Sequence, residues 1–139
     1  MASKKTKNRV TVISILLIIG LAVVAFQMVG GNKPTQLHID EAMKMIETTP
    51  NAILLDVREQ EEYDKKHLKG AILLPLNDLK TADLSTILPD KDQPIFVYCW
   101  AGRRAEYAAN DLAKFGYTKV YEIGGLLDWH GPTEGTEEE

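Results

Sequence analysis

Four short apolar runs, separated by amphipathic stretches, most strongly constrain what this chain can fold into. The runs cover residues 52–56, 71–74, 95–98 and 119–123. The first three lack the polar alternation of a strand with one face in solvent, so they suit parallel strands that are buried on both faces. Between the runs, residues 40–47, 76–88 and 104–116 have the residue pattern of helices. This alternation predicts an α/β domain with an open parallel sheet and helices on both faces.

Local signals predict where the first of these helices begins and where the last one ends. Asp40 is expected to cap the first helix, and Gly116 is expected to end the last one. The last helix has one face of small and apolar residues at helical spacing: Ala105, Ala108, Ala109, Leu112 and Ala113. A face of this kind allows the helix to lie close to the sheet.

A basic head and an uncharged apolar stretch precede the domain. Residues 1–9 contain four cations and no acidic residue, and residues 10–32 contain no charged residue. At ~1.5 Å per residue, the apolar stretch reaches the ~30 Å of a bilayer core. We therefore expect a transmembrane anchor over residues 10–32, with a cleaved signal segment as the alternative. The positive-inside rule then places residues 1–9 in the cytoplasm and the domain outside the cell membrane, or exports the domain if the head is cleaved.

The rest of the chain divides into one domain and an acidic end. Residues 33–130 are expected to form the domain, and residues 131–139 are expected to be disordered because they offer nothing to bury. The formal net charge is −4, and the chain without the four cations of its head carries −8. An acidic body argues against a nucleic acid as the partner.

The chain contains a single cysteine, Cys99, which directly follows the run 95–98. One cysteine cannot close an intramolecular disulfide, and with three scattered histidines it does not make a zinc site. In an exported domain, a lone thiol indicates either a reactive group or pairing with a thiol-bearing partner protein.

Cys99 begins a loop, CWAGRR (residues 99–104), that joins a strand end to a helix N-terminus. Ligands of open α/β sheets bind beyond the carboxyl ends of the strands, where free amides and the helix dipole attract anions. Helix N-termini and neighbouring arginines also favour the thiolate form of a cysteine. We therefore expect Cys99 to be a nucleophile. The expected substrate-binding and anion-binding loop consists of Trp100, Ala101, Gly102, Arg103 and Arg104.

Three segments together resemble the rhodanese family of sulfurtransferases. The loop CWAGRR is similar to that family's six-residue active loop, which begins with Cys. LLDVREQEEYDKKHLKGAILLP (residues 54–75) is similar to its first signature, and VYEIGGLLDW (residues 120–129) to its closing Gly-Gly-x-x-x-Trp. Lys66 departs from the pattern, because Gly often precedes the signature His. The resemblance runs from about Gln36 to Trp129 and implies a rhodanese-like open parallel sheet of five strands.

The resemblance also implies a thiosulfate sulfurtransferase. Cys99 would take a sulfane sulfur from a donor such as thiosulfate, become a persulfide, and pass the sulfur to cyanide or a thiol. A thiolate is the required nucleophile, and loop amides can stabilise the negative charge of the persulfide. This chemistry requires neither a metal nor an organic cofactor.

Two other functions stay open. Rhodanese folds also serve as inactive binding or regulatory modules, although such modules commonly lose the cysteine that this chain keeps. A Cys-based phosphatase or arsenate reductase has five residues between Cys and Arg, whereas four residues separate Cys99 from Arg104. Tyr98 also stands where those phosphatases usually carry His. The shorter loop favours a single sulfur atom over a phosphoryl group.

Two more residues are candidates at the edge of this site, and Trp100 of the loop has a further expected role. Asp56 and Arg58 follow a strand whose carboxyl end lies at the same sheet edge as Cys99, so they either border the pocket or form a structural ion pair, for example with Glu59. Trp100 is expected to face the mouth of the pocket, where an aromatic side chain could select the acceptor or contact a partner.

Overall fold

The computed structural model describes Ser14, Ile15, Ile18 and residues 32–137. Residues 32–139 form one compact unit, the domain. Over the described residues, no helix is both long enough and apolar enough to cross a bilayer. The basic head and nearly all of the stretch 10–32 lie outside the described residues, so the anchor and its orientation stay predictions.

A five-stranded sheet of entirely parallel strands forms the centre of the domain. Its strands are β1 (Thr35–Gln36), β2 (Ile53–Asp56), β4 (Ile72–Leu73), β5 (Ile95–Cys99) and β6 (Val120–Gly125), in the spatial order β1-β6-β5-β2-β4. The sheet predicted from the apolar runs is therefore confirmed. The sequence analysis missed β1, because its two residues are exposed and carry no apolar signal.

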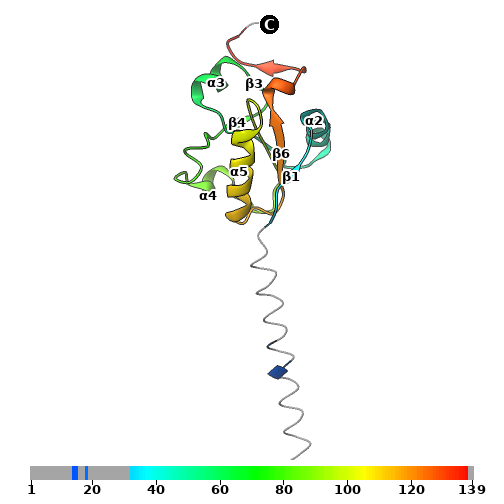
Figure 1. Cartoon of the computed structure of the whole chain (residues 1–139), viewed down its shortest axis with the longest axis vertical. Helices are drawn as coiled ribbons and strands as arrows, with labels where there is room; N and C mark the ends of the chain where they lie inside the picture. The colour runs from blue at the N-terminus through cyan, green and yellow to red at the C-terminus, as the bar shows by residue number, and fades with distance from the viewer. Residues whose placement is uncertain (1–13, 16–17, 19–31, 138–139) are drawn as a thin grey trace, which may run out of the picture. The chain divides into compact units, whose positions relative to one another are not determined.

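Helices cover both faces of the sheet, as expected (Figure 1). Side chains of β5 alternate between two cores. Ile95, Val97 and Cys99 pack with the small-residue face of α5 (Arg103–Lys114), and Phe96 and Tyr98 pack on the side of α2 (Ile39–Thr48). All five residues of β5 are buried, which explains the absence of polar alternation in this run.

Two helix predictions need correction. Residues 76–88 do not form one helix. They contain a series of turns and then the short α4 (Leu84–Ile87), because the Asp83 carboxylate accepts a hydrogen bond from the Ser85 amide at 3.1 Å and starts a new helix there. Asp40 is not the cap of α2. His38 is, and its Nδ1 accepts from the Asp40 amide at 3.4 Å.

The structure also contains α3 (Gln60–Lys65), which the sequence analysis did not predict. The short helix is stabilised by a capping box, in which Glu59 and Glu62 each accept a hydrogen bond from the other's backbone amide. The 3₁₀ helix η1 (Leu126–Asp128) follows β6.

The acidic end is ordered where disorder was expected. Strand β7 (Thr133–Glu134) pairs antiparallel with β3 (His67–Leu68). Beyond β7, the amides of Thr136 and Glu137 donate to the carbonyls of Asp64 and Lys65, both at 2.9 Å. The expectation of a disordered end is therefore wrong for residues 133–137. Backbone hydrogen bonds order this segment, and composition does not reveal such bonds.

Candidate active site

Cys99 is the last residue of β5, at the carboxyl edge of the sheet, and its side chain is turned toward α5. Only 2% of the residue is exposed, and it belongs to the core cluster that contains Ala105 and Ala108. The Gly102 amide donates a hydrogen bond to Cys99 Sγ at 3.1 Å. The sulfur thus lies at the N-terminal end of a twelve-residue helix, where free amides and the helix dipole stabilise negative charge.

Gly102 shapes the loop. It is the N-cap residue of α5 and has φ of +95°, a left-handed conformation that costs glycine little. This turn directs the Gly102 amide to the sulfur, and the helix begins immediately afterwards at Arg103. The loop therefore makes a tight turn at Gly102.

Gly124 and Gly125, at the end of β6, support the loop. The register of β5 and β6 shifts so that Cys99 lies opposite Gly125, with Gly124 at φ of +82° in the irregular stretch. The loop lies directly on Gly125, because a Cβ atom added there would be 2.0 Å from the Trp100 carbonyl oxygen. The Leu127 amide then donates to this oxygen at 3.0 Å.

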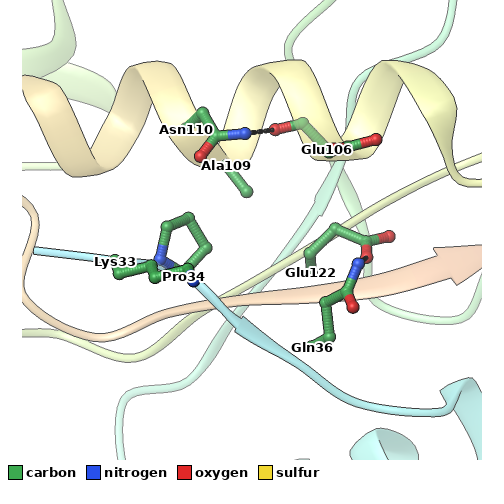
Figure 2. A pocket seen from close by; sticks show the side chains of 7 residues that line it. All are labelled: Lys33, Pro34, Gln36, Glu106, Ala109, Asn110 and Glu122. Atoms are coloured by element: carbon green, nitrogen blue, oxygen red, sulfur yellow. Dashed lines mark hydrogen bonds between the residues drawn. The ribbon is translucent and has the colours of Figure 1, made fainter.

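A buried carboxylate holds the irregular stretch in place. Glu122 Oε1 accepts from the Gly124 amide at 2.7 Å, and Glu122 Oε2 accepts from Gln36 Nε2 at 3.2 Å. Figure 2 shows the second of these bonds at the rim of a pocket of ≈ 370 Å³ between α5 and the strands β1 and β6. No residue of the loop 99–104 lines this pocket, so we assign Glu122 a structural part in placing Gly124 and Gly125.

The two arginines of the loop differ in their surroundings. Arg104 forms a bidentate ion pair with Glu62 of α3, with distances of 2.7 and 2.8 Å. The hydrogen bond with Glu62 is the largest influence on the pKa of Arg104, and it raises this pKa above its ordinary value. Arg103 is exposed, and within the described part of the chain no ion pair involves it. Of the two arginines expected in the anion-binding loop, Arg104 is thus held by Glu62 and Arg103 is exposed.

Asp56 and Arg58 form a buried ion pair with each other, and Glu59 is not the partner. Arg58 Nη2 lies 2.7 Å from Asp56 Oδ2 and also donates to the Lys66 carbonyl at 2.6 Å. Both side chains are almost fully buried, and the close contacts offset the cost of removing two charges from water. The pair is structural, although Arg58 also lines the pocket described next.

Trp100 is 46% exposed and lines a pocket of ≈ 420 Å³ beside the loop. The prediction that it faces a pocket mouth is consistent with this position. The other residues of the wall are Arg58, Glu62, Lys65, Lys66 and Glu137. We call this the Trp100 pocket.

The sequence analysis did not single out Glu62, Glu122 or Gly125. A capping-box pattern at residues 59–62 could have indicated the first, but no local signal pairs it with Arg104 across forty-two positions. Among residues 14, 15, 18 and 32–137, no three His, Cys, Asp or Glu side chains lie close enough together to hold a metal ion.

Comparison with known proteins agrees with this architecture. Residues 38–131 match the model of the Rhodanese-like domain. The chain belongs to the rhodanese-like domain family. Its fold, with five parallel strands and helices on both faces, is that of the family.

Relatives of the rhodanese-like domain carry sulfurtransferase and sulfur carrier names. Thiosulfate sulfurtransferase PspE of Escherichia coli is 43% identical over 74 residues, which cover 53% of this chain and 70% of that protein. The putative sulfur carrier protein YrkF of Bacillus subtilis is 33% identical over 100 residues, which cover 71% of this chain and 52% of YrkF. A solved structure described as a rhodanese with anions from E. coli is 39% identical, with a TM-score of 0.56 over 61% of this chain and 99% of that one.

Replacing Glu62 by Gln should lower stability at neutral pH but not in strong acid. The hydrogen bond from Arg104 is the main reason that the pKa of Glu62 falls from an ordinary 4.5 to about 2. A carboxyl with a lowered pKa stabilises the fold above pH 4.5, and this contribution is lost as the pH falls through about 2. Urea unfolding measures the free energy of unfolding of the wild type and of Glu62→Gln from pH 7 to pH 2. Plotted against pH, the two free energies should begin to converge below pH 4.5. A difference in free energy of unfolding that stays constant with pH would contradict the ion pair.

Proposed function

We propose that this chain is a thiosulfate sulfurtransferase that carries sulfur as a persulfide on Cys99. The observation that carries the proposal is the position of Cys99 Sγ, which lies at the N-terminus of α5 and accepts a hydrogen bond from the Gly102 amide at 3.1 Å. The name of the relative PspE supports the same activity. Thiocyanate formation from thiosulfate and cyanide by the full chain tests the proposal, and its absence would contradict it.

In the first half-reaction, the Cys99 thiolate attacks the outer sulfur of thiosulfate. A new S–S bond forms to Cys99, the S–S bond inside thiosulfate breaks, and its electron pair leaves with sulfite. The amides at the start of α5 stabilise the negative charge of the resulting persulfide. Arg104 adds a fixed positive charge, because Glu62 holds its guanidinium in place.

In the second half-reaction, a thiophilic acceptor attacks the outer sulfur of the persulfide. A bond forms between this sulfur and the acceptor, which is cyanide or a thiolate, and the S–S bond to Cys99 breaks. The electron pair returns to Cys99 as a thiolate, so the cycle needs no external oxidant or reductant.

The structure favours this proposal over the two alternatives. The Cys99 sulfur accepts a hydrogen bond from the Gly102 amide, only three residues along the chain, and Arg104 is paired with Glu62. The space around the sulfur therefore suits one sulfur atom better than a phosphoryl group. Tyr98 is turned to the opposite face of the sheet from Cys99, where its hydroxyl accepts from the Leu68 amide at 3.0 Å. An inactive module would not need a thiol at a helix N-terminus.

Replacing Arg103 by Ala should raise the KM for thiosulfate more than the KM for an uncharged sulfane sulfur donor. Arg103 is exposed beside the loop, and it offers a cation to the sulfite group of the donor. We expect an increase of about tenfold for thiosulfate and little change for the uncharged donor. Steady-state kinetics with both donors measures the difference, and equal effects on both would remove this role from Arg103.

The location of the enzyme belongs to the same proposal and rests on the sequence alone. The uncharged apolar residues 10–32 and the cations before them support a membrane anchor with the sulfurtransferase domain outside the cytoplasm.

A further inference from the structure

We propose that the Trp100 pocket binds the carboxylate of a small anionic thiol, and that this thiol is an acceptor of the Cys99 sulfur. The inference rests on the proposed sulfurtransferase function and names the class of acceptor. The walls of the Trp100 pocket come from the active loop, from α3 and the residues on either side of this helix, and from the ordered acidic end.

The pocket lies beside the active loop, which contributes Trp100 to its wall. Trp100 directly follows Cys99 in the chain, and Glu62 of the pocket wall holds Arg104, the last residue of the same loop. A thiol bound against the Trp100 indole therefore lies beside the loop that would carry the persulfide.

Two of the cations that line the pocket are available to a ligand. The Arg58 guanidinium is occupied by Asp56 and the Lys66 carbonyl, and Glu62 is occupied by Arg104. The ammonium groups of Lys65 and Lys66 have no ion pair among the described residues. In a domain with an excess of acidic residues, these two lysines beside an exposed tryptophan form a site for an organic anion.

The ordered acidic end already brings one carboxylate into this wall. The Glu137 amide donates to the Lys65 carbonyl at 2.9 Å, and Glu137 lines the pocket together with the two lysines. Its negative charge opposes the binding of an anion, so its removal should strengthen binding.

The size of the pocket favours a small molecule. Its volume of ≈ 420 Å³ lies in the range of ~300 to 1,000 Å³ that is typical of small-molecule sites. In the reaction, the thiolate of the acceptor attacks the outer sulfur of the Cys99 persulfide. A new S–S bond forms, the S–S bond to Cys99 breaks, and the Cys99 thiolate is released.

The binding test uses 3-mercaptopropionate and its uncharged counterpart 2-mercaptoethanol as probes. Since the chain has two tryptophans, the double variant Cys99→Ser, Trp129→Phe leaves Trp100 as the fluorescent reporter and removes the reactive thiol. We expect saturable quenching by 3-mercaptopropionate and much weaker binding of 2-mercaptoethanol. In this background, Lys65→Gln with Lys66→Gln should raise the Kd for 3-mercaptopropionate about tenfold, and Glu137→Gln should lower it.

Lys44→Gln with Lys69→Gln is the matched control, because it removes the same charge from exposed positions outside this pocket. This pair should leave the Kd unchanged. Equal Kd values for the two thiols, or equal weakening by both lysine pairs, would overturn the proposal. Circular dichroism establishes that each variant is folded.

A kinetic test separates this proposal from the proposed function. Full-length protein with Cys99 intact is first loaded with thiosulfate, and its discharge by each thiol is then followed. The lysine pair 65 and 66 should raise the half-saturating concentration of 3-mercaptopropionate and leave that of 2-mercaptoethanol unchanged. If the persulfide forms normally but its discharge does not depend on these lysines, the acceptor site is contradicted and the sulfurtransferase function is not. If the protein gains no sulfur, the function is contradicted and the binding result is unaffected.

Discussion

Thiocyanate formation from thiosulfate and cyanide should fall by about three orders of magnitude or more when Cys99 is replaced by Ser. Cys99 is the only cysteine of the chain, so no other thiol can take over the sulfur. A serine hydroxyl at the same place is a far weaker nucleophile toward sulfur, and the loop contains no general base that could activate it. Steady-state turnover of the two proteins measures the effect.

The same variant should keep its fold. Ser fits in the place of Cys99, and its hydroxyl can still accept the hydrogen bond from the Gly102 amide. Thermal unfolding should therefore give a Tm close to that of the wild type. Turnover retained by a folded Cys99→Ser protein would remove Cys99 from the mechanism.

The second large effect is expected at Gly125, which contacts no substrate in the proposed mechanism. In Gly125→Ala, the new Cβ would lie 2.0 Å from the Trp100 carbonyl oxygen and 2.6 Å from the Ala101 amide nitrogen, so the loop must move. Displacement of a catalytic loop by about 1 Å can lower kcat/KM about a hundredfold, and overpacking costs about 1 to 3 kcal/mol of stability. Measurement of kcat/KM and of urea unfolding gives both quantities.

Gly70→Ala is the control for this substitution. Gly70 has φ of +78° and no atom within 4 Å of a Cβ added to it, so the alanine introduces backbone strain without a clash with the loop. We expect a stability loss of about 1 kcal/mol with unchanged kcat/KM. If Gly125→Ala also left kcat/KM unchanged, the support of the loop by β6 would be contradicted.

The parallel sheet and the position of Cys99 at a strand end before a helix could be predicted because their signals are local. Buried strands such as β5 show a run of apolar residues, and Cys99 stands at the junction of such a run with a helix. Gly102 belongs to the same short segment, and its left-handed conformation matches what a tight turn requires.

The contacts that organise the site could not be predicted, because they join distant segments. Arg104 meets Glu62 of α3, and the loop rests on Gly125 of β6. The sequence does not distinguish the surroundings of the two adjacent arginines, whereas in the fold Arg104 lies beside Glu62 and Arg103 is exposed. The acidic end was misjudged for the same reason, since β7 is ordered through its pairing with β3.

The most direct test of the account is the intact mass of the reduced full chain after incubation with thiosulfate and removal of the excess. We predict that the wild type gains the mass of one sulfur atom, that peptide mapping places it on Cys99, and that cyanide removes it. Cys99→Ser should gain nothing under the same conditions. A wild-type chain whose mass does not change, or a sulfur atom that the Cys99→Ser variant also acquires, would contradict the central claim.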